Sequence, residues 1–256
     1  MDGLGQNETT TYQGGHMIKN WIGVVAGGAG KGKTHMALSA CQHARVFCAD
    51  TEGRAEWIKD RRFQEKSDNI DIFYAKNWQG FKEVGKAIRE WRQDNKTARP
   101  SPLLVIDSGT DFRDYAEAFV VDHRKPQHKF HKSQWGLIGK EMKNYLHALR
   151  DKLNCNVLLT SQVREKYLND KPTGIIEPRI YQRVIHEADF VMWYNEDQRQ
   201  WEVTKNVWAN PHEIWTWGVD PRKASLYPIV RDLMEQNLVE NTKNLKPNDC
   251  GFAFIP

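Results

Sequence analysis

Eight consecutive residues have the types and spacing of a phosphate-binding loop. Residues 27–34 read GGAGKGKT and match G-x-x-x-x-G-K-[ST] at every fixed position. Such a loop turns backbone N–H groups inward at a helix N-terminus, whose dipole favours anions, and so holds nucleotide phosphates. Lys33 would reach the β- and γ-phosphates, and the Thr34 hydroxyl would bind Mg²⁺. The stretch predicts a site for a nucleoside triphosphate with magnesium.

The residues on either side of this loop have the pattern of a buried strand followed by a helix. Residues 21–26 are mainly apolar and run into the loop, and residues 34–40 read as a helix leaving it. This context distinguishes a phosphate-binding loop from a glycine-rich turn without a ligand, which is the alternative interpretation. The residues expected at the nucleotide are Gly27, Gly28, Ala29, Gly30, Lys31, Gly32, Lys33, Thr34 and His35.

A carboxylate follows another apolar strand further along the chain. Residues 103–106 are all Leu, Val or Ile, and Asp107 comes directly after them. A fully apolar run of this length suits the middle of a parallel sheet. Many strands end in Asp as a turn residue, so the pattern is informative only because a phosphate-binding loop precedes it. Together with Thr34, Asp107 is the predicted magnesium ligand.

Two further strand ends carry side chains suited to hydrolysis. Asp50 and Glu52 follow the strand 45–49 and should emerge at the edge where ligands collect in open α/β sheets. Glu52 is predicted to activate the attacking water, with Asp50 as second choice; a solvated carboxylate that begins the next helix is the alternative. Gln162 follows the strand 156–160. Its amide could sense a γ-phosphate, or it could be a surface glutamine.

Strands and helices alternate along most of the chain. This order predicts an α/β fold with a mainly parallel sheet, helices on both faces and antiparallel strands at one edge. The expected elements are strands 21–26, 45–49, 70–74, 103–106 and 156–160, helices 34–40, 81–92 and 227–236, an apolar helical stripe between Trp135 and Leu153, and a hairpin of residues 190–194 and 200–204.

The composition narrows the class of protein. The 256 residues carry 37 Lys and Arg against 33 Asp and Glu, a net charge of +4 that permits a nucleic-acid surface without requiring one. The four cysteines have no metal-like spacing and are expected as reduced, mostly buried thiols. No apolar run reaches the roughly 18 residues of a membrane span, and the start does not resemble a signal peptide. We expect a cytoplasmic protein without a membrane partner.

The order of these pieces resembles the core of the RecA-like recombinases. After the phosphate loop, that family has a strand ending in Asp-x-Glu with the Glu as catalytic base, a strand ending in Asp-Ser, and a strand followed by Gln, an apolar residue and Arg. The matching segments here are 50–52, 107–108 and 162–164. The resemblance covers about residues 20–235. It implies a RecA-like P-loop ATPase that uses ATP and Mg²⁺.

One segment of the resemblance implies contact between subunits. Lys205 and Asn206 resemble a Lys-Asn-x segment whose lysines reach the nucleotide of the adjacent subunit. The bacterial recombinases have a second lysine where this chain has Val207. Cross-subunit sensing is therefore weaker here, or Arg222 or Lys223 takes that part. The resemblance implies a homo-oligomer, either a ring or a filament, with nucleotide at the subunit interfaces.

Two basic segments occur where RecA-like proteins hold single-stranded DNA. Residues 123–132 contain several Lys, Arg and His, and residues 164–174 are basic and turn-rich and contain a tyrosine. Basic grooves with stacking rings are typical of single-strand binding, although a charge run alone is usually a solvated face. The expected DNA contacts are Arg124, Lys125, Lys129, Lys132, Arg164, Lys166, Tyr167, Lys171 and Arg179.

These observations favour a Mg-ATP-dependent ATPase that binds single-stranded DNA in recombination or strand annealing. The compact size most resembles the phage Sak-type RecA-like ATPases, with a single-strand-binding protein as a further candidate partner. The alternative is an oligomeric regulatory or scaffolding ATPase that switches its assembly state with ATP and binds protein. The expected organisation is an arm of residues 1–19, an ATPase core of residues 20–236 and a tail of residues 237–256.

Overall fold

The computed structural model describes residues 20–122, 135–168, 171–208, 215–217 and 225–235. The expected arm (1–19) and tail (237–256) lie outside these residues, as does the first basic segment, 123–132. The domain boundaries at residues 20 and 236 therefore stay predictions.

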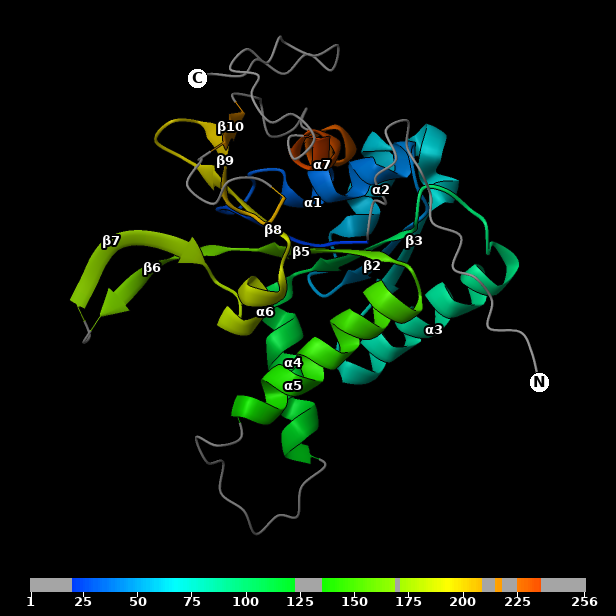
Figure 1. Cartoon of the computed structure of the whole chain (residues 1–256), viewed down its shortest axis with the longest axis horizontal. Helices are drawn as coiled ribbons and strands as arrows, with labels where there is room; N and C mark the ends of the chain where they lie inside the picture. The colour runs from blue at the N-terminus through cyan, green and yellow to red at the C-terminus, as the bar shows by residue number, and fades with distance from the viewer. Residues whose placement is uncertain (1–19, 123–134, 169–170, 209–214, 218–224, 236–256) are drawn as a thin grey trace.

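An eight-stranded sheet forms the centre of the described structure (Figure 1). Its strand order is β10-β9-β8-β1-β5-β4-β2-β3. The strands from β8 to β3 run parallel, and β9 and β10 add antiparallel strands at one edge. The strands are β1 (Ile22–Ala26), β2 (Val46–Asp50), β3 (Ile70–Tyr74), β4 (Leu103–Asp107), β5 (Asn156–Ser161), β8 (Phe190–Asn195), β9 (Gln200–Asn206) and β10 (Trp215–Trp217).

Helices cover both faces of this sheet (Figure 1). One face carries α1 (Lys33–Leu38), α2 (Ala55–Arg62) and α7 (Leu226–Glu235), with 3₁₀ turns at Ser39–Gln42 and Gln64–Asn69. The other face carries α3 (Trp78–Asp94), α4 (Gly109–Asp122), α5 (Trp135–His147) and α6 (Gln182–Glu187), and a π-helical turn, Ala148–Lys152, extends α5.

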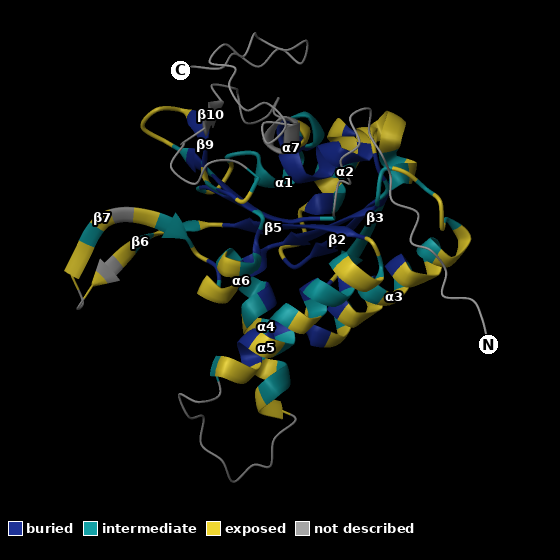
Figure 2. Ribbon diagram, viewed as in Figure 1, coloured by how far each residue is buried: buried dark blue, intermediate teal, exposed yellow. Residues whose placement is uncertain are grey.

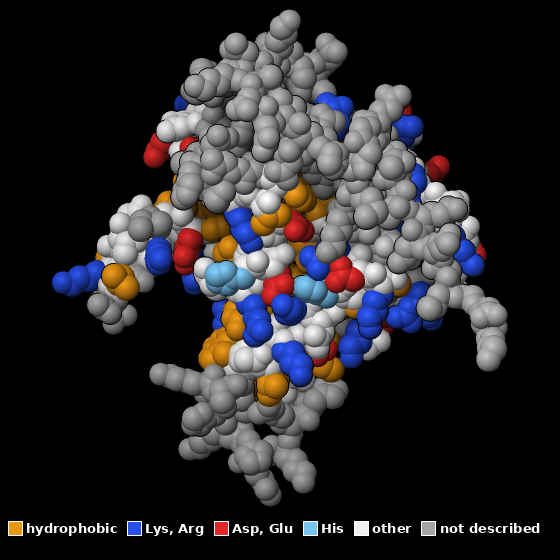
Figure 3. All heavy atoms as spheres, viewed as in Figure 1, with side chains coloured by type: hydrophobic (Ala, Val, Ile, Leu, Met, Phe, Trp, Pro, Cys, Tyr) orange, Lys and Arg blue, Asp and Glu red, His pale blue; other side chains and the backbone are white. Residues whose placement is uncertain are grey.

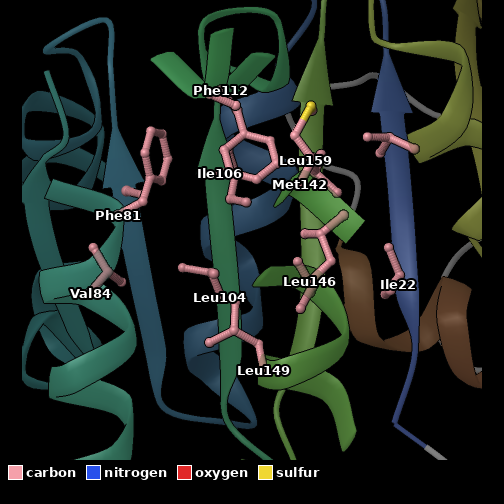
Figure 4. Close-up of a cluster of buried hydrophobic side chains, with 14 of the residues drawn as sticks. Ile22, Phe81, Val84, Leu104, Ile106, Phe112, Met142, Leu146, Leu149 and Leu159 are labelled. Carbon is pink, nitrogen blue, oxygen red and sulfur yellow. The ribbon is translucent and has the colours of Figure 1, made fainter. Parts of the chain in front are cut away.

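The central strands are buried on both faces, because helices cover each side (Figure 2). Along β4, Leu103 and Val105 pack toward α1 and α7, whereas Leu104 and Ile106 pack toward α3, α4 and α5. Figure 4 shows this second cluster, in which Phe112 of α4 lies over the strands. An apolar layer therefore packs on each face of the sheet, and buried polar side chains lie mainly at the ends of its strands.

The observed fold confirms the predicted α/β class and most of its elements. Each predicted strand is present with its ends within two residues, and β8 and β9 form the predicted hairpin, with β10 outside it at the edge of the sheet. The apolar stripe of α5 is core, since Ile138, Met142 and Leu149 are buried. Cys41, Cys48 and Cys155 are buried free thiols, as expected. The sequence interpretation missed α4, α6 and β10.

The second basic segment is not a loop, which corrects the expectation for residues 164–174. It forms most of a two-stranded hairpin of β6 (Val163–Leu168) and β7 (Lys171–Pro178), which extends away from the body (Figure 1). The basic residues and the Pro and Gly suggested a loop. However, Val163 and the β-branched pair at 175–176 favour extended backbone, and Gly174, at φ 71°, absorbs a local irregularity.

Candidate nucleotide site

The loop between β1 and α1 depends on its glycines. Gly30 and Gly32 have φ angles of 74° and 79°, a left-handed conformation that side chains disfavour. An added Cβ at Gly28 would lie 2.3 Å from Oε1 of Glu196. Nζ of Lys31 lies 3.4 Å from the carboxylate of Glu196. The turn between β8 and β9 thus packs directly against the loop.

Lys33 lies across the loop that precedes it. Its ammonium donates to the carbonyls of Gly27 and Gly28, with N···O distances of 2.9 and 2.8 Å. Burial lowers the pKa of Lys33, and the carboxylates of Asp107 and Glu52 oppose this shift. This ammonium is the group that the sequence predicts to reach the β- and γ-phosphates of a bound triphosphate.

Asp107 and Thr34, the two predicted magnesium ligands, lie in hydrogen-bonding contact. The Thr34 hydroxyl donates to Oδ2 of Asp107 at 2.7 Å, and the Thr160 hydroxyl donates to Oδ1. Asp107 is only 4% exposed. Burial raises its pKa, although the hydrogen bonds from Thr160 and Thr34 act in the opposite direction. Hard oxygen donors of this kind suit Mg²⁺, so the residues present fit the predicted metal.

Asp50 organises the turn that follows β2. Its Oδ1 accepts hydrogen bonds from the backbone N–H groups of Glu52 and Gly53, at 3.0 and 2.7 Å, and its Oδ2 accepts one from Ala55 at 2.9 Å. Asp50 is fully buried. Because both of its oxygens are engaged by the backbone, the geometry favours Glu52 over Asp50 as the base.

Glu52 presents its carboxylate at the surface of the same turn. Arg54 forms an ion pair with it, and its Nε lies 3.9 Å from Oε2. Partial burial raises the pKa of Glu52, the nearby charge of Asp107 raises it further, and Arg54 lowers it. A carboxylate with a raised pKa is better suited to accept a proton from water near neutral pH.

The parallel topology brings these groups to one edge of the sheet. The loop follows β1, Glu52 follows β2, Asp107 ends β4 and Gln162 follows β5. The Gly27 N–H donates to the Ser161 carbonyl at 3.0 Å, and the Thr51 N–H donates to the Asp107 carbonyl at 2.6 Å. The carboxyl ends of four strands thus share one site, as expected for an open α/β sheet.

Comparison with known proteins places this arrangement in a family. A family model described as an AAA domain matches residues 19–217. The chain belongs to the AAA domain family. Among solved structures 211 chains match, one of them the crystal structure of the RadB recombinase. That structure is 15% identical, with a TM-score of 0.50 over 79% of this chain and 88% of its own. No curated protein matches the chain.

The likeness to the RadB recombinase shows that this AAA domain has a RecA-like fold. At 15% identity, the likeness to RadB concerns the fold alone. It confirms the predicted P-loop architecture. No helix among the described residues is long and apolar enough to cross a membrane.

In this AAA domain, Gln162 stands between the site and the β6–β7 hairpin. Gln162 is exposed, and its backbone carbonyl accepts a hydrogen bond from the Arg179 N–H at 2.6 Å. The Arg179 carbonyl in turn accepts one from the Thr110 hydroxyl, at 2.7 Å, in the first turn of α4. Both ends of the hairpin are therefore fixed next to the strand ends that form the site.

Lys205 has an internal contact in this chain. Its ammonium donates to the carbonyls of Ile185 and His186, both at 2.9 Å, near the C-terminal end of α6. Cations commonly bind the last carbonyls of a helix in this way. Val207, two residues on, is 52% exposed. The cross-subunit role of Lys205 stays a prediction; Arg222 and Lys223 lie outside the described residues.

The basic residues of the second segment have different environments on the hairpin. Arg164 is paired with Glu177, with 2.9 Å between the guanidinium and the carboxylate. Lys166, Lys171 and Arg179 are exposed. For Tyr167 only the strand backbone is described. The remaining predicted contacts, Arg124, Lys125, Lys129 and Lys132, lie outside the described residues.

Sequence reasoning missed three polar residues around the predicted metal ligands. Thr160 holds the second oxygen of Asp107, and Thr51 and Asp111 form hydrogen bonds at the end of β4. Their signal in the sequence was weak. Thr160 is a fully buried polar residue near the end of an apolar strand, and Asp111 follows Asp107 by one helical turn.

Proposed function

We propose that the chain hydrolyses ATP with Mg²⁺ and binds single-stranded DNA, acting in homologous recombination or strand annealing. The convergence of Lys33, Thr34, Asp107 and Glu52 at one sheet edge is the observation that carries the ATPase proposal. The β6–β7 hairpin, which begins directly after Gln162, is the element proposed to carry DNA.

In the proposed reaction, water attacks the γ-phosphorus of ATP and the bond to the β-phosphate oxygen breaks, which gives ADP and phosphate. Glu52 accepts the proton that the water loses. Lys33 balances the charge of the β- and γ-phosphates, and Thr34 and Asp107 would hold Mg²⁺, which neutralises phosphate charge when bound. Positioning and charge stabilisation supply most of the catalysis in such reactions.

The hairpin has the surface expected of a single-strand-binding element. It extends away from the sheet, and Lys and Arg side chains reach its outer end (Figure 3). Lys166 and Lys171 are exposed, and so are the apolar side chains of Leu168 (64%) and Ile176 (42%). Single-strand sites combine cations for the phosphates with flat or apolar contacts for the bases.

The link between ATP and DNA would run through the base of the hairpin. Gln162 lies at the end of β5, and Thr110 lies three residues after Asp107. The Gln162 carbonyl accepts a hydrogen bond from the Arg179 N–H at 2.6 Å, and the Thr110 hydroxyl donates one to the Arg179 carbonyl at 2.7 Å. A shift of these strand ends on γ-phosphate release would therefore reach the hairpin, so DNA should stimulate hydrolysis.

The assembly and the biological setting belong to the same proposal. We propose a cytoplasmic homo-oligomer of the phage Sak type, with nucleotide between subunits and Lys205 facing a neighbour's nucleotide after leaving its contact on α6. Residues 1–19, 20–236 and 237–256 would be its arm, core and tail. A single-strand-binding protein would be its accessory partner.

A second candidate function is a regulatory or scaffolding ATPase that binds protein through the hairpin. The observations that favour it are the exposed Leu168 and Ile176, and the Arg164–Glu177 pair, which neutralises one of the expected DNA contacts. Apolar side chains exposed together commonly mark contact with another protein. A measurement of single-stranded DNA binding distinguishes the two candidate functions, because only the first requires it.

The double variant Lys166→Ala/Lys171→Ala should weaken DNA binding and lose DNA stimulation of hydrolysis. If each lysine contacts a phosphate of a single strand, the slope of log affinity against log salt should fall by about 1.4 in magnitude. The measurements are anisotropy titrations of a labelled oligonucleotide at several salt concentrations and the ATPase rate with and without that oligonucleotide.

The matched control is Lys96→Ala/Lys152→Ala, which removes two exposed lysines elsewhere and should change neither quantity. Lys33→Ala gives the background rate. If the wild type hydrolyses ATP but neither binds nor responds to DNA at low salt, the scaffolding candidate replaces the DNA-binding one.

A further inference from the structure

Thr51 connects the turn that carries Glu52 to the end of the strand that carries Asp107. The Thr51 N–H donates to the Asp107 carbonyl at 2.6 Å. Its hydroxyl oxygen lies 2.5 Å from Oδ2 of Asp111 and accepts a hydrogen bond from the Ser108 N–H at 2.9 Å. Thr51 is 5% exposed, so water competes little for these bonds.

Asp111 completes this connection from α4. It lies in the first turn of the helix, where a carboxylate is stabilised by the helix dipole. Its Oδ2 accepts from the Thr51 hydroxyl and lies 3.3 Å from the Ser108 hydroxyl. One oxygen of Asp111 therefore contacts the hydroxyl of Thr51, which follows β2, and the hydroxyl of Ser108, which follows β4.

The shape of the turn and its placement depend on different residues. Asp50 binds three N–H groups within residues 52–55 and so fixes the internal shape of the turn. Those bonds would survive if the whole turn moved relative to β4. The pairing of β2 with β4 aligns Asp50 with Asp107. The bonds of Thr51 to Asp107, Ser108 and Asp111 continue this connection beyond the paired residues and fix the turn itself relative to the end of β4.

We propose that Thr51 and Asp111 are positioning residues for hydrolysis, which hold Glu52 at a fixed distance from Asp107. Neither contacts the nucleotide in this role; they act on the placement of the base relative to the residue that would hold the metal. The inference rests on the proposed ATPase function, and it adds two residues to it. Small displacements of a base from its water lower the rate steeply, because proton transfer requires hydrogen-bonding distance.

The test is Thr51→Val, which removes the hydroxyl but keeps the shape of the side chain. The expected result is a fall in kcat of about 10- to 100-fold, the range found when residues that orient a catalytic group are removed. KM and the affinity for a non-hydrolysable ATP analogue should stay at the wild-type values, because Lys33 and the loop are untouched. Thr51→Ser restores the hydroxyl and should recover most of the rate. Asp111→Asn should lower kcat in the same way.

Two control variants separate positioning from general damage to the fold. Thr204→Val removes a hydroxyl that lies 3.4 Å from the Val191 carbonyl in the edge hairpin, and it should keep the wild-type kcat. Asp114→Asn removes a neighbouring exposed charge of α4 and should do the same. A wild-type kcat in both Thr51→Val and Asp111→Asn would overturn the inference, as would a loss of analogue affinity equal to the loss of rate. If Glu52→Gln also keeps the wild-type rate, the proposed base is wrong instead.

Discussion

Glu52→Gln should lower the rate of ATP hydrolysis by about a thousandfold, the loss typical of removing a general base. Nucleotide should stay bound, because Gln is close in size to Glu and the loop, Lys33 and Thr34 are unchanged. Asp50 would still hold the turn, since it accepts from the backbone of residue 52 and not from its side chain. Single-turnover hydrolysis and equilibrium binding of the nucleotide measure the two quantities separately.

The matched control is Glu56→Gln on α2, where the same change breaks a partly buried ion pair with Lys59, in which Nζ lies 3.3 Å from Oε1. Its rate should equal that of the wild type. A Glu52→Gln enzyme that hydrolyses ATP at the wild-type rate would exclude Glu52 as the base. One that no longer binds nucleotide would indicate a binding role.

The pH profile gives an independent view of the same residue. Burial and the charge of Asp107 raise the pKa of Glu52 above its ordinary value of 4.5. Glu52 accepts a proton only when it is ionised, so the rate should rise as the pH increases through this raised pKa. This acid limb should lie at a higher pH than for a free glutamate, and it should vanish in Glu52→Gln.

The fold was predictable because its signals are local and repeated. Each central strand is a short apolar run, and the strict order of the loop, Glu52, Asp107 and Gln162 places four strand ends in sequence along the chain. Parallel topology then brings those ends to one edge, so most of the candidate site followed from the order of its parts.

The unpredicted parts depend on contacts between distant segments. The hydrogen bonds from Thr160 to Asp107 and from Thr51 to Asp111 join different elements, and polar residues at strand ends occur in many unrelated turns. The β6–β7 hairpin was missed because its basic residues suggested a loop, while its strand pairing depends on two segments of weak pattern. Residue type alone also did not show that Arg164 is paired with Glu177.

Asp107→Asn should abolish most of the hydrolysis and yet stabilise the fold. Burial raises the pKa of Asp107 above 3.8, so the folded state favours the protonated form. The protonated Asp107 carboxyl therefore contributes fully to the free energy of unfolding when the pH is below the pKa that Asp107 has in the unfolded chain. This contribution is lost as the pH rises through the higher pKa of the folded state. At neutral pH the buried charge destabilises the protein, and asparagine removes that charge. The amide can still form hydrogen bonds with Thr34 and Thr160, whose hydroxyls both donate and accept.

The thermal midpoint of Asp107→Asn at neutral pH should rise by about 2–4 °C for each kcal/mol gained in the free energy of unfolding, the scaling for a chain of this size. The midpoints of variant and wild type should converge in acid, where Asp107 is protonated. The rate of Mg-dependent hydrolysis should fall by about a hundredfold or more, as when one preorganised charge contact is removed from an active site. Calorimetry without nucleotide tests the predicted rise in thermal midpoint, and a magnesium titration of the ATPase rate tests the predicted loss of hydrolysis.

The opposite signs of these two effects distinguish a ligand from a structural carboxylate. Asp71 on the edge strand β3 provides the comparison, because its carboxylate forms an ion pair with Arg45 at 2.5 Å. Asp71→Asn should therefore not raise the thermal midpoint. A carboxylate kept buried at a cost to stability is explained if it serves the reaction. If Asp107→Asn lowers the midpoint while hydrolysis persists, Asp107 is a structural residue and the metal ligand must be sought elsewhere on that edge.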